Sequence, residues 1–272
     1  MNKEYIKFSY ELDKFQIEGC NTIANNENLL VTAHTGSGKT VLALYAIAKC
    51  LTEGKKVVYT SPIKTLSNQK FAEFSDQLIK SGQFPDKTIG IMTGDIRYAP
   101  NADVVVMTTE ILRNLLYKKG SATEHLGLTA SLSLENLDAV IFDECHYINN
   151  KERGSVWEET MILLPNQTNL VLLSATIDSA ELFASWLGEL KQKPIHLIST
   201  TYRIVPLEHY VIKKDTYETI MDAKEVFYGD AYNRWTSWKR DQEKNQKQQK
   251  QQKQQQRQQQ RQQFKSILIH QH

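Results

Sequence analysis

Two apolar runs, each followed at once by a short polar segment, place the strongest constraint on how this chain can fold. Leu29–Val31 leads into Ala33, His34, Thr35, Gly36, Ser37, Gly38, Lys39 and Thr40. Ala139–Phe142 leads into Asp143 and Glu144. Apolar runs of this length are typical of strands buried in a parallel sheet. Because such strands end at one edge of the sheet, the two polar segments are expected to meet there.

The first polar segment has the composition of a phosphate-binding loop. Gly36 and Gly38 permit backbone conformations and a close approach that a side chain would block. A helix beginning there would direct unpaired N–H groups and its positive dipole end toward an anion. Lys39 would then reach the β- and γ-phosphates of a nucleotide, and the Thr40 hydroxyl would ligate Mg²⁺. Ala33 stands where the usual pattern begins with glycine, so an ordinary turn before an amphipathic helix is the alternative.

The second polar segment supplies the acidic groups that a magnesium nucleotide needs. Asp143 is a hard oxygen ligand that can hold Mg²⁺ through its water shell. Glu144 beside it is suited to orient and deprotonate an attacking water molecule. An Asp-Glu pair after a strand is often only surface charge, but Lys39 upstream in the same α/β pattern favours an ATP site. The expected cofactors are ATP and Mg²⁺, with Lys39, Asp143 and Glu144 as the catalytic group.

Composition and charge argue against several classes of protein. No stretch approaches the roughly 18 apolar residues of a membrane span, and the first residues lack the apolar core of a secretory signal. The three cysteines, Cys20, Cys50 and Cys145, lack Cys-x-x-Cys spacing, so neither a zinc site nor a disulfide framework is expected. These features predict a soluble intracellular protein with no membrane partner.

Apolar strands alternate with longer amphipathic segments, a pattern typical of a parallel sheet with helices on both faces. The predicted strands are 28–33, 56–60, 88–92, 104–107, 138–142, 169–173 and 195–198. The predicted helices are 13–25, 39–53, 64–80, 109–117, 154–163 and 178–188, with Asp13, Ser61-Pro62 and Asp178 as openers and Gly54 closing the second. Residues 118–134 are expected to form a loop, 207–213 an outgoing strand, and 215–240 a charged, aromatic segment of helical character.

The last segment is a low-complexity tail. Residues 239–272 carry nine Lys and Arg against two acidic residues, and residues 242–263 include 14 glutamines. Lys or Arg recurs every three or four residues, which places the cations along one face of a helix. A solvated tail is the main interpretation. There are two alternatives. The cations could form a basic stripe along nucleic-acid phosphates, although the lack of aromatic residues between them weakens this interpretation. The helix could also form a coiled-coil-like surface for a partner.

A short polar segment, Ser174, Ala175 and Thr176, follows the apolar run Leu170–Leu173. After the phosphate loop and the Asp-Glu-x-His segment, it is the third mark of a superfamily 2 nucleic-acid helicase. Further segments are Glu11–Gln16, Thr60–Phe71, Thr93–Asp95, Met107–Tyr117, Arg153–Gly154 with Trp157–Glu159, and Arg203 with Val205–Glu208. In this order they resemble the superkiller-type DExH RNA helicases, the exosome-associated and antiviral group, over roughly residues 8–213.

The resemblance implies a fold and several roles around the nucleotide. The fold is a RecA-like three-layer α/β domain, a mostly parallel sheet flanked by helices, with a helical or disordered Gln-rich tail. Gln16 is expected to read the adenine edge, with Phe15 or Phe8 packing nearby. For Phe15, the alternative is a role as the core anchor of the first helix. His146 resembles the residue that couples the nucleotide site to the facing lobe, and Ser174, Ala175 and Thr176 would relay the nucleotide state.

The resemblance also implies a track for single-stranded RNA along three strand ends. Helix N-termini and Lys64 would contact phosphates without reading sequence, and a plain capped helix is the alternative. The candidate residues are Pro62, Ile63, Lys64 and Gln69 in the first group, Thr93, Gly94 and Asp95 in the second, and Thr108, Thr109, Glu110 and Arg113 in the third.

The chain departs from the family after residue 213. These helicases hydrolyse ATP between two RecA-like lobes, and the second supplies arginine fingers from a Gln-x-x-Gly-Arg-x-Gly-Arg segment that this sequence lacks. The expected division is an ATP-binding lobe at 1–206, a linker and start of a second lobe at 207–240, and the tail at 241–272. A separate chain would supply the second lobe, or the chain is the shortened product of a larger gene.

Three functions are consistent with these features. The first is an ATP-dependent RNA helicase, whose ATP-binding lobe hydrolyses ATP to ADP and phosphate while it binds single-stranded or partly duplex RNA. The second is a DNA helicase of the same superfamily, because backbone contacts do not encode the sugar. The third is a truncated, non-unwinding module that binds nucleotide and RNA. Since an arginine finger speeds turnover by orders of magnitude, weak binding and slow hydrolysis are expected, without strand separation by this chain alone.

Overall fold

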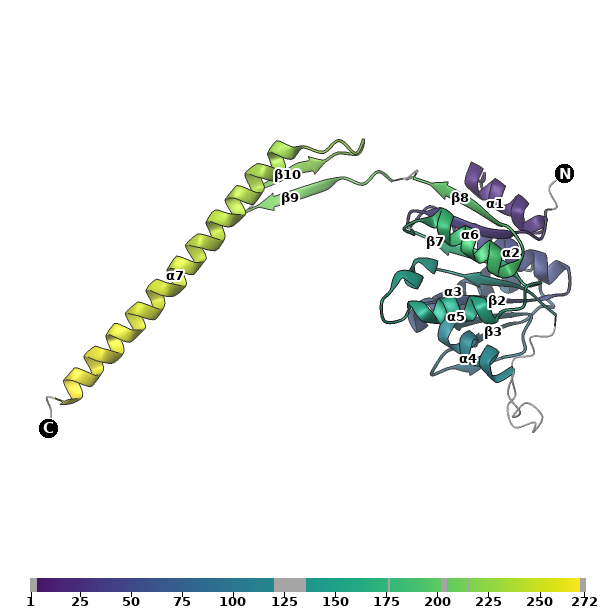
Figure 1. Cartoon of the computed structure of the whole chain (residues 1–272), viewed down its shortest axis with the longest axis horizontal. Coiled ribbons are helices and arrows are strands. Elements are labelled where there is room, and N and C mark those ends of the chain that lie inside the picture. The colour runs from purple at the N-terminus through teal and green to yellow at the C-terminus, as the bar shows by residue number, and fades with distance from the viewer. Residues whose placement is uncertain (1–3, 120–135, 176, 202–204, 215, 270–272) are drawn as a thin grey trace. The chain divides into compact units, whose positions relative to one another are not determined.

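The computed structural model of the chain describes residues 4–119, 136–175, 177–201, 205–214 and 216–269. The chain divides into two compact units, Met1–Tyr202 and Arg203–His272. Figure 1 shows an α/β first unit, and a second unit made of a hairpin and a long helix.

An eight-stranded sheet forms the centre of the first unit, with the order β4-β3-β5-β2-β6-β7-β1-β8. The strands are β1 (Asn28–Ala33), β2 (Lys56–Ser61), β3 (Ile89–Met92), β4 (Arg97–Tyr98), β5 (Val104–Thr108), β6 (Leu137–Phe142), β7 (Asn169–Ser174) and β8 (Ile195–Thr200). Neighbours are parallel except for β3 and β4. All seven predicted strands of this sheet are confirmed. The unpredicted β4 has only two residues, both exposed, and so leaves no apolar run.

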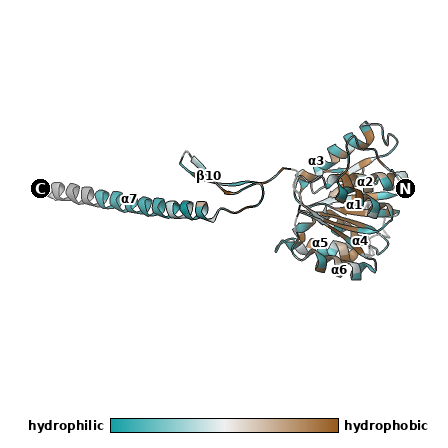
Figure 2. Ribbon diagram, turned by 90° about the horizontal axis from the view of Figure 1, so that it is seen from above, coloured by the Kyte–Doolittle hydropathy of each residue, from teal (hydrophilic) through white to brown (hydrophobic). Residues whose placement is uncertain are grey.

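Helices cover both faces of the sheet, as the sequence predicts. The helices α1 (Lys14–Ala24), α2 (Thr40–Thr52) and α3 (Lys64–Phe74) lie on one face, and α4 (Thr109–Lys119), α5 (Gly154–Leu163) and α6 (Ala180–Lys191) lie on the other (Figure 2). Strand side chains alternate between the two cores: Leu29 and Val31 pack into the α1–α3 side, and Leu30 packs into the opposite one. The predicted three-layer α/β fold is confirmed.

Helix boundaries differ from the prediction at a few residues. Asp13 opens α1 as predicted, and its N–H donates to Oε1 of Gln16 at 2.9 Å. The helix predicted to begin at residue 64 does begin at Lys64, although Ile63 rather than Ser61-Pro62 stands directly before it. The opener predicted at Asp178 is wrong by one residue, since Ser179 precedes α6. The helix predicted over 64–80 ends at Phe74 and continues as a π-helical segment, Ser75–Lys80. There the Ser75 hydroxyl donates to the carbonyl of Phe71 at 2.7 Å, which competes with the regular helical bonds.

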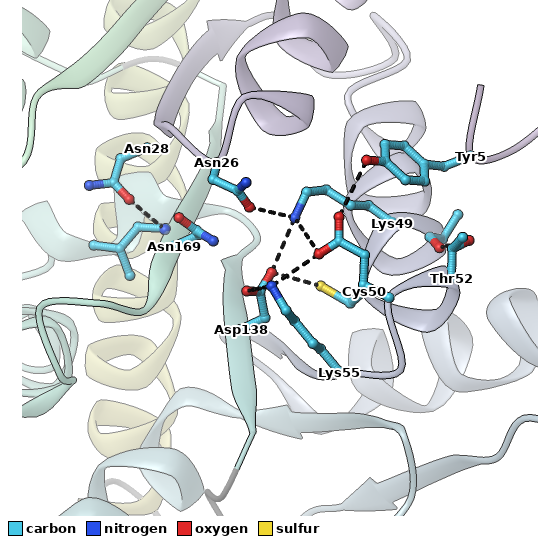
Figure 3. Close-up of polar contacts among 12 residues, drawn as sticks. Tyr5, Asn26, Asn28, Lys49, Cys50, Thr52, Lys55, Asp138 and Asn169 are labelled. Atoms are coloured by element: carbon cyan, nitrogen blue, oxygen red, sulfur yellow. Dashed lines mark hydrogen bonds and ion pairs between the residues drawn. The ribbon is translucent and has the colours of Figure 1, made fainter. Parts of the chain in front are cut away.

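A buried charge cluster lies at the amino edge of the sheet, where the parallel strands begin (Figure 3). Lys49 of α2 is only 2% exposed, and its ammonium contacts Asn26 at 2.7 Å and both Asp138 and Glu53 at 3.3 Å. Lys55 approaches the second oxygen of Asp138 at 2.7 Å. Burial opposes the ionisation of Asp138, but the bond from Lys55 and the charge of Lys49 outweigh it and hold the pKa of Asp138 below its usual value. The cluster therefore joins α2 to the start of β6.

The second unit pairs β9 (His209–Lys213) with β10 (Thr216–Met221) in an antiparallel hairpin, followed by α7 (Gly229–Ile269). The outgoing strand predicted at 207–213 is confirmed. The helical interpretation of 215–240 is wrong for 216–221, where Thr, Tyr and Ile residues favour a strand. Trp235 of α7 donates its indole N–H to the carbonyl of Ile212 at 3.2 Å, which joins helix and hairpin. Among the described residues, no helix combines the length and apolar composition needed to cross a membrane.

Candidate nucleotide site and strand-end track

The predicted phosphate loop connects β1 to α2 at the carboxyl edge, where the parallel strands end. Gly36 and Gly38 have φ angles of +83° and +87°, a left-handed conformation that favours glycine. The N–H of Ser37 donates to the carbonyl of His34 at 3.1 Å and tightens the turn between them. A β-carbon at Gly38 would lie 2.6 Å from the side-chain nitrogen of Gln16. The loop is therefore a cradle at the start of α2 that depends on glycine at both positions.

Lys39 folds back over the loop. Its ammonium donates to the carbonyls of Ala33 and His34, at 2.6 and 3.0 Å, and the residue is 9% exposed. Burial lowers the pKa of Lys39, and the charges of Glu144 and Asp143 act in the opposite direction without cancelling it. The structure thus brings together the lysine and the two acids that lie far apart in the sequence.

Asp143 and Glu144 follow β6, two strands away from β1. The N–H of Asp143 donates to the carbonyl of Thr60 at 2.9 Å, which continues the β2–β6 pairing. One carboxylate oxygen of Asp143 accepts the N–H of Glu144 at 3.0 Å, and the other accepts the hydroxyl of Tyr59. Glu144 has a φ of +51°, unusual for a residue with a side chain. Its Oε2 lies 3.3 Å from Nδ1 of His146, although the two atoms do not meet in hydrogen-bond geometry.

The Thr40 side chain has a lysine partner that sequence reasoning missed. The Lys70 ammonium donates to Oγ1 of Thr40 at 3.0 Å and pairs with Glu73 at 2.9 Å. Lys70 and Tyr59 both lie in or beside the Thr60–Phe71 segment that carries the family resemblance. A signal was available for Tyr59, since a phenol at an inward position of a buried strand needs a polar partner.

Gln16 lies at the phosphate loop, and both ends of its amide are engaged. Its Oε1 accepts the N–H of Asp13, and its Nε2 donates to the carbonyl of Gly38 at 3.1 Å. A cavity of about 320 Å³ adjoins Gly38 and Thr40, and Phe8 is among its lining residues. Phe8 and Phe15 both pack against the core on the α1–α3 side, and the structure places only Phe8 at this cavity.

The first two groups of the predicted RNA track lie side by side. Pro62 is buried, whereas Ile63, Lys64 and Gln69 are exposed at the start and along the side of α3. The Lys64 ammonium pairs with Asp95 at 2.6 Å, across the loop that follows β3. A β-carbon at Gly94 would lie 3.1 Å from that ammonium, so Gly94 adjoins the pair. The hydroxyl of Thr93 accepts the N–H of Ile96 at 3.2 Å and shapes the same loop.

The third group joins the first through Arg153. The Nε–H of Arg153 donates to the carboxylate of Glu110 at 3.1 Å, and Nη2 of Arg153 donates to the carbonyl of Pro62 at 2.7 Å. Arg113 contacts Glu159 at 3.4 Å. Thr108 and Thr109 are both buried. β3, β5 and β2 are neighbours in the sheet, so the three groups form one stretch of the carboxyl edge, and Arg153 is a member that sequence reasoning did not select.

The predicted coupling residues that the structure describes lie on two segments, one directly after the acids and one at the end of the strand between β6 and β1. His146 belongs to a short 3-10 helix, Cys145–Asn149, that follows Glu144. Ser174 ends β7, the strand between β6 and β1, and is paired in register with Thr32. Ala175 follows it, and Thr176 lies outside the described residues.

Unpartnered polar atoms test whether a nucleotide and its metal fit this edge. Within the described part of the chain, buried polar atoms without a hydrogen-bond partner include Oγ of Ser37, Oε2 of Glu144 and Oγ of Ser174. Buried polar atoms are nearly always satisfied, so these call for a polar group that the protein itself does not supply. Together with the glycine cradle, they fit a triphosphate and a hard cation.

Comparison with known proteins decides the family. A model of the DEAD/DEAH box helicases matches residues 13–183. The chain belongs to the DEAD/DEAH box helicases. "Exosome RNA helicase MTR4" of Homo sapiens is 44% identical over 229 residues, which are 84% of this chain and 20% of that protein. "Superkiller complex protein 2" of Homo sapiens is 41% identical over 83% of this chain and 17% of its own length. The resemblance to superkiller-type DExH helicases is confirmed.

The match covers only part of these relatives. "mRNA transport homolog 4" of Caenorhabditis elegans is 45% identical over 75% of this chain and 18% of its own length. The chain therefore spans about a fifth of the length of the curated relatives it matches.

Solved helicase structures share the fold. The Mycobacterium smegmatis helicase Lhr, bound to single-stranded DNA and AMP-PNP, aligns with a TM-score of 0.50 and 29% identity over 68% of this chain and 25% of that one. The helicase MrfA, bound to DNA and AMPPNP, aligns with a TM-score of 0.56 over 70% of this chain and 27% of that one. At 21% identity, the likeness to MrfA is one of fold alone.

Proposed function

We propose that this chain is the ATP-binding lobe of an ATP-dependent RNA helicase, which hydrolyses ATP to ADP and phosphate in coupling with single-stranded RNA. The observation that carries the proposal is that Lys39, Asp143 and Glu144 follow two parallel strands, β1 and β6, that end at one edge of the sheet with only β7 between them. The names of the relatives favour RNA over DNA as the substrate.

The chemistry follows from the groups at this edge. Residues Ala33–Thr40 would hold the triphosphate, and Thr40 and Asp143 would hold Mg²⁺. Bound Mg²⁺ would neutralise charge on the phosphate oxygens. Glu144 would orient the attacking water and accept its proton at Oε2, which has no hydrogen-bond partner among the described residues. The Lys39 ammonium would then donate to phosphate oxygens instead of the carbonyls of Ala33 and His34.

The remaining roles extend this proposal. Gln16 would contact the adenine, and Phe8 would border it through the cavity beside the loop. The exposed Lys64 and the helix start around it would grip the RNA backbone. His146, Ser174, Ala175 and Thr176 would relay the nucleotide state. A second RecA-like lobe would complete the site with arginine fingers, supplied by a separate chain or by further sequence. The three buried, unpaired cysteines support an intracellular location.

ATP turnover and nucleotide binding by the full 272-residue chain test the proposal. We expect Lys39→Ala to lose both, and Glu144→Gln to keep binding while turnover falls by about 100-fold. Lys80→Met is a matched control, because Lys80 pairs with Asp76 on the surface. Wild-type turnover equal to that of both site variants would instead indicate a non-catalytic binding module. Stronger stimulation by single-stranded DNA than by RNA would favour the DNA helicase.

A further inference from the structure

Tyr59 of β2 contacts one of the proposed metal ligands. Its hydroxyl donates to Oδ2 of Asp143, and the opposite oxygen, Oδ1, accepts the N–H of Glu144 at 3.0 Å. Each oxygen of the Asp143 carboxylate therefore has a donor of its own. A carboxylate held at both oxygens has a fixed orientation, and that orientation decides where a cation or its water shell can bind.

Two features of the fold fix the position of Tyr59. β2 and β6 are paired in parallel register, with Tyr59 opposite Ile141, so the phenol extends toward the end of β6 where Asp143 lies. Tyr59 is 1% exposed, and its ring packs edge-on against Phe74 of α3, with centroids 5.0 Å apart and planes at 79°. The hydroxyl is thus presented by a rigid strand and backed by a helix, rather than by a mobile loop.

The Tyr59 hydroxyl is suited to act as the donor in this contact, because a phenol carries its proton at neutral pH and an ionised carboxylate only accepts. The sequence motifs of the site do not include Tyr59, which lies one residue before the segment Thr60–Phe71.

We propose that Tyr59 is a positioning residue, which orients the Asp143 carboxylate for the metal of the nucleotide site. The assignment rests on the proposed function, because it presupposes that Asp143 serves Mg²⁺. Donors behind metal-binding carboxylates typically change metal affinity by about 10- to 100-fold when they are removed. Loss of the Tyr59 hydroxyl should therefore raise the Mg²⁺ requirement while leaving metal-free nucleotide binding unchanged.

The test is a Mg²⁺ titration of the full chain with a fluorescent, non-hydrolysable ATP analogue. We expect Tyr59→Phe to raise the half-saturating Mg²⁺ concentration by about tenfold. Nucleotide affinity in EDTA should match that of the wild type. Tyr5→Phe is the matched control, since it removes a phenol that donates to the carboxylate of Glu53 at 3.3 Å, at the far edge of the sheet. Its Mg²⁺ midpoint should not move.

Two further variants separate positioning from folding. In an Asp143→Asn background, adding Tyr59→Phe should produce no further change in the Mg²⁺ midpoint, because the group that Tyr59 orients has lost its charge. Phe74→Leu keeps the phenol but loosens its support, and should give a smaller rise of the same sign. A folded Tyr59→Phe protein with the wild-type midpoint would overturn the assignment alone. Absence of Mg²⁺-dependent binding in the wild type would overturn the proposed function, and this assignment with it.

Discussion

Replacing Lys49 by methionine measures how much the buried charge cluster at the amino edge stabilises the first unit. Methionine keeps the length and apolar stem of the side chain but removes the ammonium. Asp138, whose side chain is 11% exposed, and Glu53, at 26%, would lose one cation each. Both keep Lys55, at 2.7 and 3.0 Å. The variant therefore weakens the cluster without leaving either carboxylate unpaired.

The size of the effect follows from that residual pairing. Removing one partner of a fully buried ion pair costs about 3–5 kcal/mol, because an uncompensated charge is left behind. Since Lys55 still compensates both acids and is itself 40% exposed, we expect Lys49→Met to lower the free energy of unfolding by a smaller amount, about 2–3 kcal/mol. For a unit of this size, that corresponds to a fall in Tm of about 5–10 °C.

Urea denaturation of the wild type and variant at neutral pH measures the loss directly. Lys80→Met is the control, because Lys80 and Asp76 form an exposed helical pair, with side chains 74% and 61% accessible, of a kind worth about 0.3–0.5 kcal/mol. A Lys49→Met loss no larger than that of the control would refute the reasoning, since it would mean that burial adds nothing to this cluster. Nucleotide binding should be unchanged in the Lys49→Met variant, because Lys49 lies at the amino edge of the sheet, away from the phosphate loop.

Three other substitutions have definite expected outcomes. The pKa of Asp138 is held low in the folded state, so its contribution to the free energy of unfolding is present at neutral pH and lost as the pH falls below about 4. Between pH 7 and pH 3, Asp138→Asn should therefore lose less free energy of unfolding than the wild type. Parallel curves of unfolding free energy against pH would contradict this. Gly154→Ala would bring a β-carbon to 2.1 Å from the carbonyl oxygen of Ile148 and should destabilise by about 2–3 kcal/mol in urea denaturation, whereas an unchanged midpoint would exclude the clash. Lys70→Met frees Oγ1 of Thr40 and removes a nearby cation, so the Mg²⁺ midpoint for nucleotide binding should fall; a rise would show that Lys70 assists the metal.

The sheet and its layers could be predicted from the sequence because local signals fix them. Each of the seven strands is an apolar run bounded by turn or helix-start residues, and the helices between them are amphipathic. The same signals fail where a strand is too short to show a run, as in β4, or where aromatic and charged residues are mixed, as in β10. There the pairing partner decides the structure, and a single sequence does not reveal it.

The candidate site was predictable to the same extent. Residues at strand ends could be selected because parallel strands bring their ends to one edge. The sequence alone does not identify Tyr59, Lys70 and Arg153, because their roles depend on contacts with side chains from other elements. The partner of Tyr59 is set by the register of β2 on β6, and that of Lys70 by the packing of α3 beside α2. The positions of residues at strand ends therefore identify candidate site residues, whereas the pairing register of the strands decides which side chains contact one another.

The strand order divides the carboxyl edge into two halves. β3, β5 and β2 end in the candidate RNA residues, and β6, β7 and β1 end in the candidate nucleotide residues. The halves meet where β2 adjoins β6, and there Tyr59 and the carbonyl of Thr60 both bond Asp143. On the helix side, Lys70 of α3 reaches Thr40 of α2. A movement of β2 on RNA binding would therefore act directly on Asp143, and a movement of α3 would act directly on Thr40. Substitutions at this boundary should change how RNA alters nucleotide affinity more than they change the affinity for RNA itself.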